Sequence, residues 1–264
     1  MPFSNKVVWV TVASSGIGKA LAIELSKQNA KLILSSRNSE SLELVKNACK
    51  NLENIKIIPL DLEDYTNLHF KAKDAIAAFG TIDILINNGG ISQRSLVENT
   101  QIEVDKRIMD VNYLGTVALT KAILPYFIKH QKGQFVVTTS IVGKIGTPLR
   151  SSYAASKHAL HGFFDSLRAE NHLNNIKVTL VCPGFIHTNV SKNALTGNGT
   201  PQGKMDTATA NGMSPERFSK LMLKAIENKK EEVYIAGAKE KLGVYLKRFF
   251  PSLFAVFIRK MRVT

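Results

Sequence analysis

The chain has 264 residues, is 44% hydrophobic and carries a formal net charge of +14. This length can bury the core of one domain, and no linker-like run or internal repeat divides it. An excess of basic charge can indicate a nucleic-acid partner. Much of this charge, however, lies in residues 239–264, which hold seven Lys or Arg against one Glu, a net +6. The remaining charge forms no basic cluster and accompanies no recognition motif, so we expect no nucleic-acid partner.

The cysteines, the histidines and the first apolar run bear on the cellular compartment and on metal binding. Cys49 and Cys182 give no disulfide framework, which favours a reducing compartment. The first apolar run, residues 7–13, is too short for a signal or membrane segment, and we therefore expect a cytoplasmic protein. His158 and His161 lie three residues apart without further ligands at metal spacing, so we expect no metal site.

Short β-branched apolar runs alternate with longer helical stretches along the chain. The runs predict seven strands, at 6–12, 31–35, 56–60, 82–86, 134–139, 177–182 and 232–235. Helices are expected at 17–29, 39–51, 65–79, 101–130, 153–173 and 214–229. Near-continuous hydrophobicity is typical of parallel strands covered on both faces. The pattern predicts an α/β fold: one doubly wound, seven-stranded parallel sheet of the Rossmann type over residues 1–238.

The ends of the first two predicted strands indicate a nucleotide site, because ligands of such sheets bind at the carboxyl ends of the strands. The first strand leads into a turn with Gly16 and Gly18 and then a helix, where backbone N–H groups can bind a pyrophosphate. After the second strand, residues 34–37 offer no acid for a ribose 2′-hydroxyl, and Arg37 can pair with a 2′-phosphate. This favours NADP; the alternative for Arg37 is a solvated side chain.

Polar residues also follow the later strands. Asp61 comes after the third, Asn87-Asn88-Gly89-Gly90 after the fourth, and Ser140 ends the fifth. Tyr153 and Lys157 share one face of the next helix. An ammonium beside a phenol stabilises the phenolate and lowers a pKa that is ordinarily about 10, while Ser140 can hold a substrate oxygen. A lone Tyr or Lys is usually a packing or solvated residue, so it is their joint placement that indicates proton transfer.

These motifs together resemble the classical short-chain dehydrogenases/reductases over essentially the whole chain. The resemblance rests on the turn at 11–18, Asn87-Asn88-x-Gly90, Asn112, Ser140, Tyr153-x3-Lys157 and Pro183-Gly184. Segments 87–95, 112–115 and 155–160 look most like the dehydrogenase/reductase member 7 group, neighbours of the hydroxysteroid dehydrogenases.

The resemblance implies a catalytic tetrad. Tyr153 would be the acid in reduction and the base in oxidation, and Ser140 would orient the carbonyl. Lys157 would bind the nicotinamide ribose and lower the phenol pKa, and Asn112 would hold a water in the proton relay. The implied reaction is hydride transfer between NADP(H) and a carbonyl/alcohol pair, with steroids, retinoids or other lipophilic ketones and aldehydes as the suggested substrates.

The resemblance also implies the cofactor contacts. Ser14, Gly16, Ile17 and Gly18 would lie near the phosphates, Asp61 and Leu62 at the adenine, Asn88 near the adenosine ribose, and Ile186 and Thr188 at the carboxamide. Residues 189–213 correspond to the substrate-binding loop. We also expect a homo-oligomer.

Two positions depart from the family pattern. Val12 stands where the family has its first glycine, and Gly89 where alanine is usual. Gly89 only removes a methyl group and should be tolerated. Val12 bears on cofactor affinity, because a β-branched residue resists positive φ and adds bulk beneath the dinucleotide. Val12 is also the one feature that supports an alternative function, a binding or regulatory protein that keeps the fold but turns over no substrate.

The C-terminal tail, residues 239–264, lies outside the family pattern. Leu242, Tyr245, Leu246 and Phe249 recur at helical spacing, and Leu253, Val256, Phe257 and Met261 do so after Pro251. The spacing predicts two short amphipathic helices. Their mixture of Phe with Lys and Arg is typical of a segment at a membrane interface. The alternative is that the apolar faces pack back on the domain or on a neighbouring subunit, near the 189–213 loop.

Overall fold

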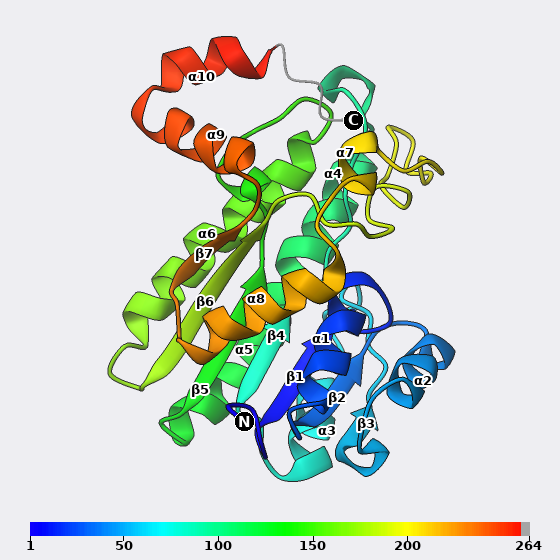
Figure 1. Cartoon of the computed structure of the whole chain (residues 1–264), viewed down its shortest axis with the longest axis vertical. Coiled ribbons are helices and arrows are strands. Elements are labelled where there is room, and N and C mark those ends of the chain that lie inside the picture. The colour runs from blue at the N-terminus through cyan, green and yellow to red at the C-terminus, as the bar shows by residue number, and fades with distance from the viewer. Residues whose placement is uncertain (260–264) are drawn as a thin grey trace.

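The computed structural model describes residues 1–259, which form one parallel sheet between two helical layers (Figure 1). The seven strands run in the order β3-β2-β1-β4-β5-β6-β7. This order confirms the predicted doubly wound Rossmann fold as a single domain. The strands are β1 (Val7–Thr11), β2 (Lys31–Ser35), β3 (Ile55–Ile57), β4 (Ile84–Asn87), β5 (Gly133–Thr138), β6 (Ile176–Pro183) and β7 (Glu232–Ile235).

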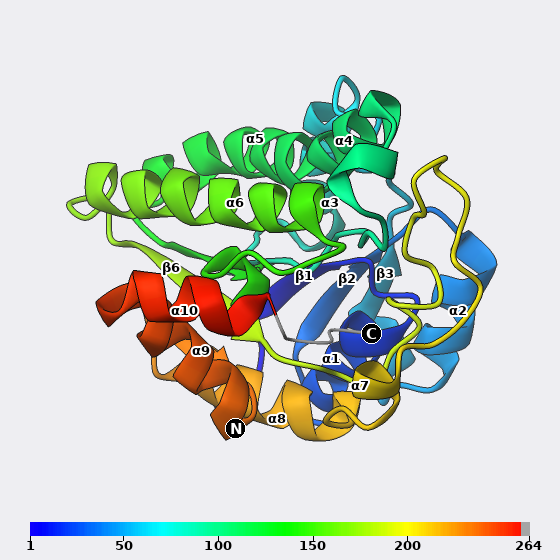
Figure 2. The same cartoon turned by 90° about the horizontal axis from the view of Figure 1, so that it is seen from above.

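Helices cover both faces of the sheet, as Figure 2 shows from above. One layer holds α3 (Leu68–Phe79), α4 (Ile102–Met109), α5 (Gly115–Lys129) and α6 (Ser151–Glu170), and the other holds α1 (Gly16–Ser26), α2 (Ser39–Asn47) and α8 (Pro215–Glu227). Alternate residues of β1 enter the two cores: Trp9 packs with the first layer, Val8 and Val10 with the second. Burial on both faces explains why the strands read as continuous apolar runs.

The boundaries differ from the predicted ones in two informative places. The third strand was predicted to reach residue 60 but ends at Ile57, so Asp61 does not follow it directly. Pro59 has no N–H to donate to a ladder, which explains the early end. The helix predicted over 101–130 is interrupted by a π-helical turn, Asp110–Leu114, between α4 and α5.

Taken together, Ile102–Lys129 is the one helix in the described chain with the length and apolar composition to cross a membrane. It packs against α3 and α6 in this fold. Core helices of soluble proteins can have the same length and apolar composition.

Short elements that the sequence did not predict lie in the connections. They are three 3₁₀ turns, η1 (Leu52–Asn54), η2 (Val97–Asn99) and η4 (Ile141–Gly143), and a one-turn helix, α7 (Thr207–Ala210), inside the 189–213 loop.

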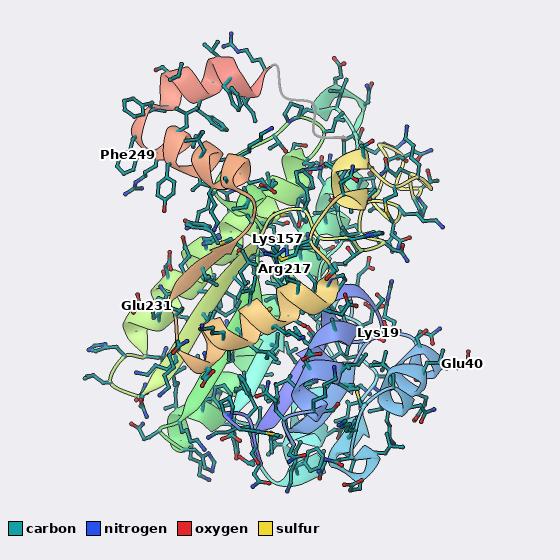
Figure 3. All side chains as sticks on the ribbon, in the orientation of Figure 1. Lys19, Glu40, Lys157, Arg217, Glu231 and Phe249 are labelled. Carbon is teal, nitrogen blue, oxygen red and sulfur yellow. The ribbon has the colours of Figure 1, made fainter. Side chains whose placement is uncertain are left out.

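The tail forms the two predicted helices, α9 (Ala238–Phe249) and α10 (Pro251–Ile258), above α6 in Figure 1. Val244 and Phe254 are buried against Ile141, Ile145 and Cys182. The predicted apolar stripe, in contrast, mostly faces outward, and Phe249 marks this outer side in Figure 3. Met261 lies outside the described residues. In the tail, the large apolar side chains that are 50 to 67% exposed are Leu242, Tyr245, Phe249, Phe250, Leu253, Val256 and Phe257.

Candidate active site

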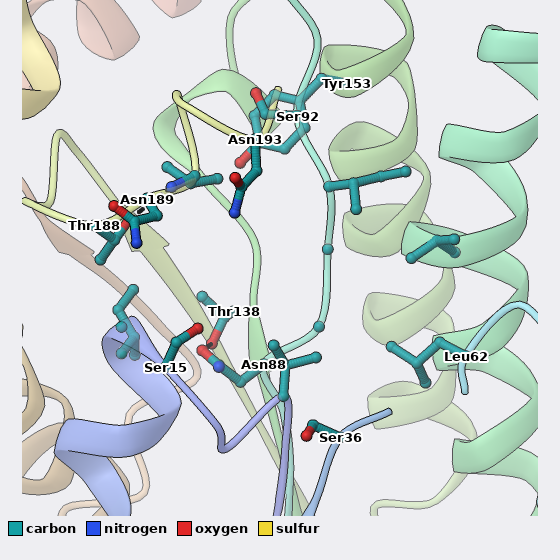
Figure 4. Close-up of a pocket in the computed structure, with 18 of the residues that line it drawn as sticks. Ser15, Ser36, Leu62, Asn88, Ser92, Thr138, Tyr153, Thr188, Asn189 and Asn193 are labelled. Carbon is teal, nitrogen blue, oxygen red and sulfur yellow. Dashed lines mark hydrogen bonds between the residues drawn. The ribbon is translucent and has the colours of Figure 1, made fainter. Parts of the chain in front are cut away.

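A cavity of about 590 Å³ opens at the carboxyl ends of the central strands. Figure 4 shows its two ends, with Ser15 and Ser36 near one and Tyr153 and Ser92 near the other. Nearly all the predicted cofactor residues line it, although they come from distant parts of the chain. These are Ser14, Gly16, Ile17, Arg37, Asp61, Leu62, Asn88, Tyr153, Lys157, Ile186 and Thr188.

At the first end, the N-terminus of α1 is shaped to accept an anion. Gly16 begins the helix with φ +52°, a conformation that favours glycine, and Ser15 makes no capping hydrogen bond through its side chain. The first N–H groups of a helix have no partners within it, and the first turn of α1 holds no acid. Gly18 lies behind this wall, where a Cβ would collide with the carbonyl oxygen of Val12. Gly18 therefore allows α1 to begin close to β1.

Polar residues of both charges line the cavity beside this helix terminus. Ser36 and Arg37 follow β2, and Arg37 is exposed. Asp61 binds its own loop, accepting a hydrogen bond from the backbone N–H of Glu63 at 3.1 Å. The Asn88 side chain is fixed by Thr138, whose hydroxyl donates to its Oδ1 at 3.2 Å.

At the other end, Ser140, Tyr153 and Lys157 meet on the wall of the cavity. Ser140 follows β5 by two residues, and its hydroxyl accepts a hydrogen bond from the backbone N–H of Val142 at 3.1 Å. Lys157 is buried and donates to the carbonyl oxygen of Thr138 at 2.9 Å, with its Nζ 5.8 Å from the centre of the Tyr153 ring. A phenol, a hydroxyl and an amine thus converge where a small carbonyl compound can enter.

Burial and positive charge have opposite effects on Tyr153. Burial raises the pKa of Tyr153 and outweighs a hydrogen bond with Ser140 and the positive charges of Arg150 and Arg94, which lower it. The two arginines are favourable charges that sequence reasoning did not identify. Burial lowers the pKa of Lys157 to about 8.

Asn112 stands behind the wall of the cavity, in the π-helical turn. It is fully buried, and its amide bonds both backbone groups of Ile91, donating to the carbonyl at 2.9 Å and accepting from the N–H at 2.8 Å. It also donates to the Ser156 hydroxyl at 3.0 Å. The residue thus joins the segment after β4 to α6; its place in a proton relay stays a prediction.

Gln93, which sequence reasoning did not single out, caps the helix that carries Tyr153. The N-cap residue of α6 makes no capping bond of its own. The buried Gln93 Oε1 accepts a hydrogen bond from the backbone N–H of Ser152 at 2.9 Å, and the N–H of Tyr153 lies 3.5 Å away. The only sequence signal was a polar run, Ser92 to Ser95, in the segment that follows the fourth strand.

Val12 adopts the strained conformation expected at its position. Its φ is +49°, and its side chain lines the cavity beside the start of α1. A β-branched residue in this region is a steric outlier, so the turn holds Val12 against its preference.

The other candidate residues outside the cavity form no metal site. In residues 1–259, no group of three His, Cys, Asp or Glu side chains could hold a metal ion. His161 lies 3.8 Å from the Cys182 thiol, and both cysteines are free.

Comparisons with known proteins agree with this geometry. Residues 6–199 match the family model for short chain dehydrogenases. The chain is 44% identical to a dehydrogenase/reductase SDR family protein 7-like of Anopheles gambiae, over 97% of this chain and 83% of that protein. It is 43% identical to dehydrogenase/reductase SDR family member 7B of Bos taurus, over 95% and 79% of the two chains.

The fold is also that of solved structures. A short-chain dehydrogenase/reductase from Burkholderia phymatum, in complex with NAD, matches with a TM-score of 0.82 at 21% identity, over 96% of each chain. From the family match and the closely similar relatives, this chain belongs to the short-chain dehydrogenase/reductase family and falls in its dehydrogenase/reductase member 7 group.

Proposed function

We propose that this protein is an NADP(H)-dependent oxidoreductase that transfers a hydride between the nicotinamide and a carbonyl/alcohol pair. One observation carries the proposal: Ser140, Tyr153 and Lys157 share a cavity with the anion-accepting N-terminus of α1. Phosphate groups of a dinucleotide fit that terminus, and Lys157 and Asn88 would bind its riboses. The nicotinamide would supply or accept the hydride.

Side chains of the protein carry out the proton transfer. In reduction, Ser140 orients the carbonyl oxygen and the Tyr153 hydroxyl donates its proton to it; in oxidation, Tyr153 accepts the proton from the alcohol. The positive charges of Arg150 and Arg94 lower the pKa of Tyr153 and so assist the second direction, against the burial that raises it.

NADP is favoured by the residues around the end of β2. Residues 34–37 contain no acid, and Arg37 lines the cavity beside Ser36. An acid here would bind a ribose 2′-hydroxyl and repel a 2′-phosphate, whereas an arginine pairs with that phosphate.

The lining of the cavity includes apolar side chains that suit a lipophilic substrate. They come from the segment after β4 and from the 189–213 loop, namely Ile91, Val190, Leu195 and Pro201. Steroid-, retinoid- or lipid-like ketones and aldehydes are the classes to test.

A spectrophotometric assay of NADPH oxidation with a panel of lipophilic carbonyl compounds tests this function. The Tyr153→Phe variant is the control, and it should lose at least about 100-fold in turnover while keeping its fold. Near-wild-type turnover in that variant would refute the mechanism.

Val12 supports a second candidate, a cofactor-binding regulatory protein that turns over no substrate. Its side chain occupies part of the cavity wall in a strained conformation. Measuring NADPH affinity alongside turnover separates the two functions: tight binding with no turnover of any compound favours the regulator.

We further propose that the tail contacts an anionic membrane surface. Its outward side chains are aromatic or aliphatic, and the exposed bases Lys239, Lys247, Arg248 and Arg259 border them. Apolar insertion and attraction to anionic lipid act together on such a surface. A second copy of the chain is the alternative occupant, in line with the expected homo-oligomer.

A further inference from the structure

The segment Ser92–Ser95 joins the substrate loop to the start of α6. The backbone of Arg94 donates to the carbonyl of Leu195 at 2.8 Å, and that of Leu195 donates to Ser92 at 2.9 Å. On the other side, Ser95 donates to the carbonyl of Leu149 at 3.1 Å. This segment therefore touches both the 189–213 loop and the residues just before Tyr153.

Three buried charged side chains meet at this junction. Arg94 donates from Nε to Asp206 Oδ2 at 2.8 Å, and Arg150 Nη2 lies 3.7 Å from the same oxygen. The three side chains are only 2 to 6% exposed. They come from the segment after β4, from the N-terminus of α6 and from the substrate loop. We call Arg94, Asp206 and Arg150 the loop triad.

Additional contacts hold the triad in place. Gln202 Nε2 donates to the second carboxylate oxygen of Asp206 at 3.0 Å, and the Arg150 guanidinium lies 5.4 Å from the centre of the Phe185 ring. Burial alone would raise the pKa of Asp206, but the hydrogen bonds and charges of its partners lower it. Asp206 is therefore ionised at neutral pH, and the triad carries a net positive charge.

This charge acts next to the proton-transfer residue. Arg150 is the N-cap residue of the helix on which Tyr153 lies one turn later, and the charges of both arginines favour the ionised phenol. Two further charged groups lie on elements packed here: Lys157, on the same helix, and Asp105 of α4, which accepts a hydrogen bond from the Ser152 hydroxyl. Of these groups, only Asp206 belongs to the loop over the cavity.

We propose that the loop triad couples the position of the 189–213 loop to the charge around Tyr153, with Arg94 and Arg150 as positioning residues for proton transfer. Asp206 fastens the loop to the two arginines, and Arg150 stabilises the phenolate. This inference rests on the proposed function of Tyr153, but its test needs no turnover.

Fluorine NMR of full-length protein labelled with fluorinated tyrosine measures the phenol directly. Ring fluorination lowers all phenol pKa values, which brings the titration into a range where the chain is folded. The Tyr153→Phe variant assigns the Tyr153 signal among the six tyrosines. The variants are Arg150→Met, the charge-retaining control Arg150→Lys, and Asp206→Asn.

Opposite shifts distinguish a charge effect from simple loosening. The Tyr153 titration should move up by about one pH unit in Arg150→Met, stay near the wild-type value in Arg150→Lys and move down in Asp206→Asn. Loosening of the site would move both Arg150→Met and Asp206→Asn down, because burial raises this pKa. An unchanged or lower titration in Arg150→Met would overturn the positioning role.

Limited trypsin digestion tests the loop half of the proposal. Lys192 and Lys204 are exposed in the loop, and cleavage at them should speed up several-fold in Asp206→Asn. Unchanged cleavage would overturn the fastening role. If the shifts occur but no carbonyl compound is reduced, the charge coupling stands and the proposed enzymatic function fails.

Discussion

Leu62 fills the space in front of Gly89 in the wall of the cavity: a methyl group on Gly89 would collide with Leu62 Cδ1. Val12 Cγ2 would lie 3.4 Å from the same methyl, at the edge of ordinary van der Waals contact. The two departures from the family pattern therefore lie in the same part of the wall. We interpret Leu62, rather than Val12, as the residue that excludes a methyl group at position 89.

These contacts predict separate effects of Val12 and Gly89. Val12→Gly should stabilise the fold by about 1 kcal/mol, because relief of strain exceeds the added backbone entropy of the unfolded glycine, and should tighten NADPH binding several-fold. Gly89→Ala should cost about 1 to 2 kcal/mol through overpacking against Leu62. Most of that cost should persist in the double variant, because the colliding side chain is still present. Urea unfolding of the four proteins measures these values, and a loss of the Gly89→Ala cost in the double variant would contradict the assignment to Leu62.

Cofactor preference should depend on Arg37. Arg37→Ala should weaken NADPH binding about 10-fold, since charge-assisted hydrogen bonds to the 2′-phosphate are lost, and should leave NADH binding nearly unchanged. Fluorescence titration with both nucleotides measures this. Arg217→Ala, which removes an exposed charge outside the cavity wall, is the matched control. Our assignment fails if wild-type protein prefers NADH or if Arg37→Ala keeps the wild-type preference.

Burial of Lys157 should give a characteristic pH dependence of stability. Its pKa falls to about 8 in the folded chain, so between pH 8 and the ordinary lysine range near 10.5 the unfolded chain binds one more proton. Wild-type stability should therefore rise with pH in this window relative to Lys157→Met, by at most about 1.4 kcal/mol per pH unit. Urea unfolding from pH 7 to 10.5 measures the difference. Parallel curves would show that Lys157 titrates normally.

Gln93 should affect turnover through the position of Tyr153. Gln93→Ala removes the cap of α6 and should cost about 2 kcal/mol of stability as well as a large part of the turnover, because the phenol is no longer held in place. Ser214→Ala is the control, since Ser214 caps α8 away from the cavity. It should lose about 1 kcal/mol without loss of turnover. Equal effects of both variants on turnover would show that Gln93 does not position Tyr153.

Local pattern was enough to predict the parallel sheet and the convergence of Ser140, Tyr153 and Lys157. These depend on strand hydrophobicity, on the shared edge of parallel strands and on helical spacing. The contacts of Gln93 and Arg94 could not be predicted, because Arg94 meets Asp206 across 112 residues. A sequence also does not show that burial raises the pKa of Tyr153.

The tail was predicted as two helices, but its periodicity could not tell which residues face the domain. The apolar residues of both helices recur at helical spacing. In the structure, however, Val244 and Phe254 are buried against the domain, and most of the residues in the predicted stripes are exposed. In α9 the buried residues are Gly243 and Val244, which lie outside the predicted stripe.

That division of the tail yields separate tests of membrane binding and packing. The double variant Phe249→Ser/Phe257→Ser changes only exposed residues, so it should keep its melting temperature but lose most binding to anionic vesicles. Phe254→Ser should instead lower stability by about 3 kcal/mol, since Phe254 is buried. Leu173→Ser, at an exposed apolar residue far from the tail in sequence, is the control.

Co-sedimentation at low and high salt measures vesicle binding, which salt should weaken because the basic residues contribute to it. If neither wild-type protein nor a chain ending at Ala238 binds, the membrane proposal is wrong. A concentration-dependent dimer that the double variant abolishes would assign the surface to a second copy.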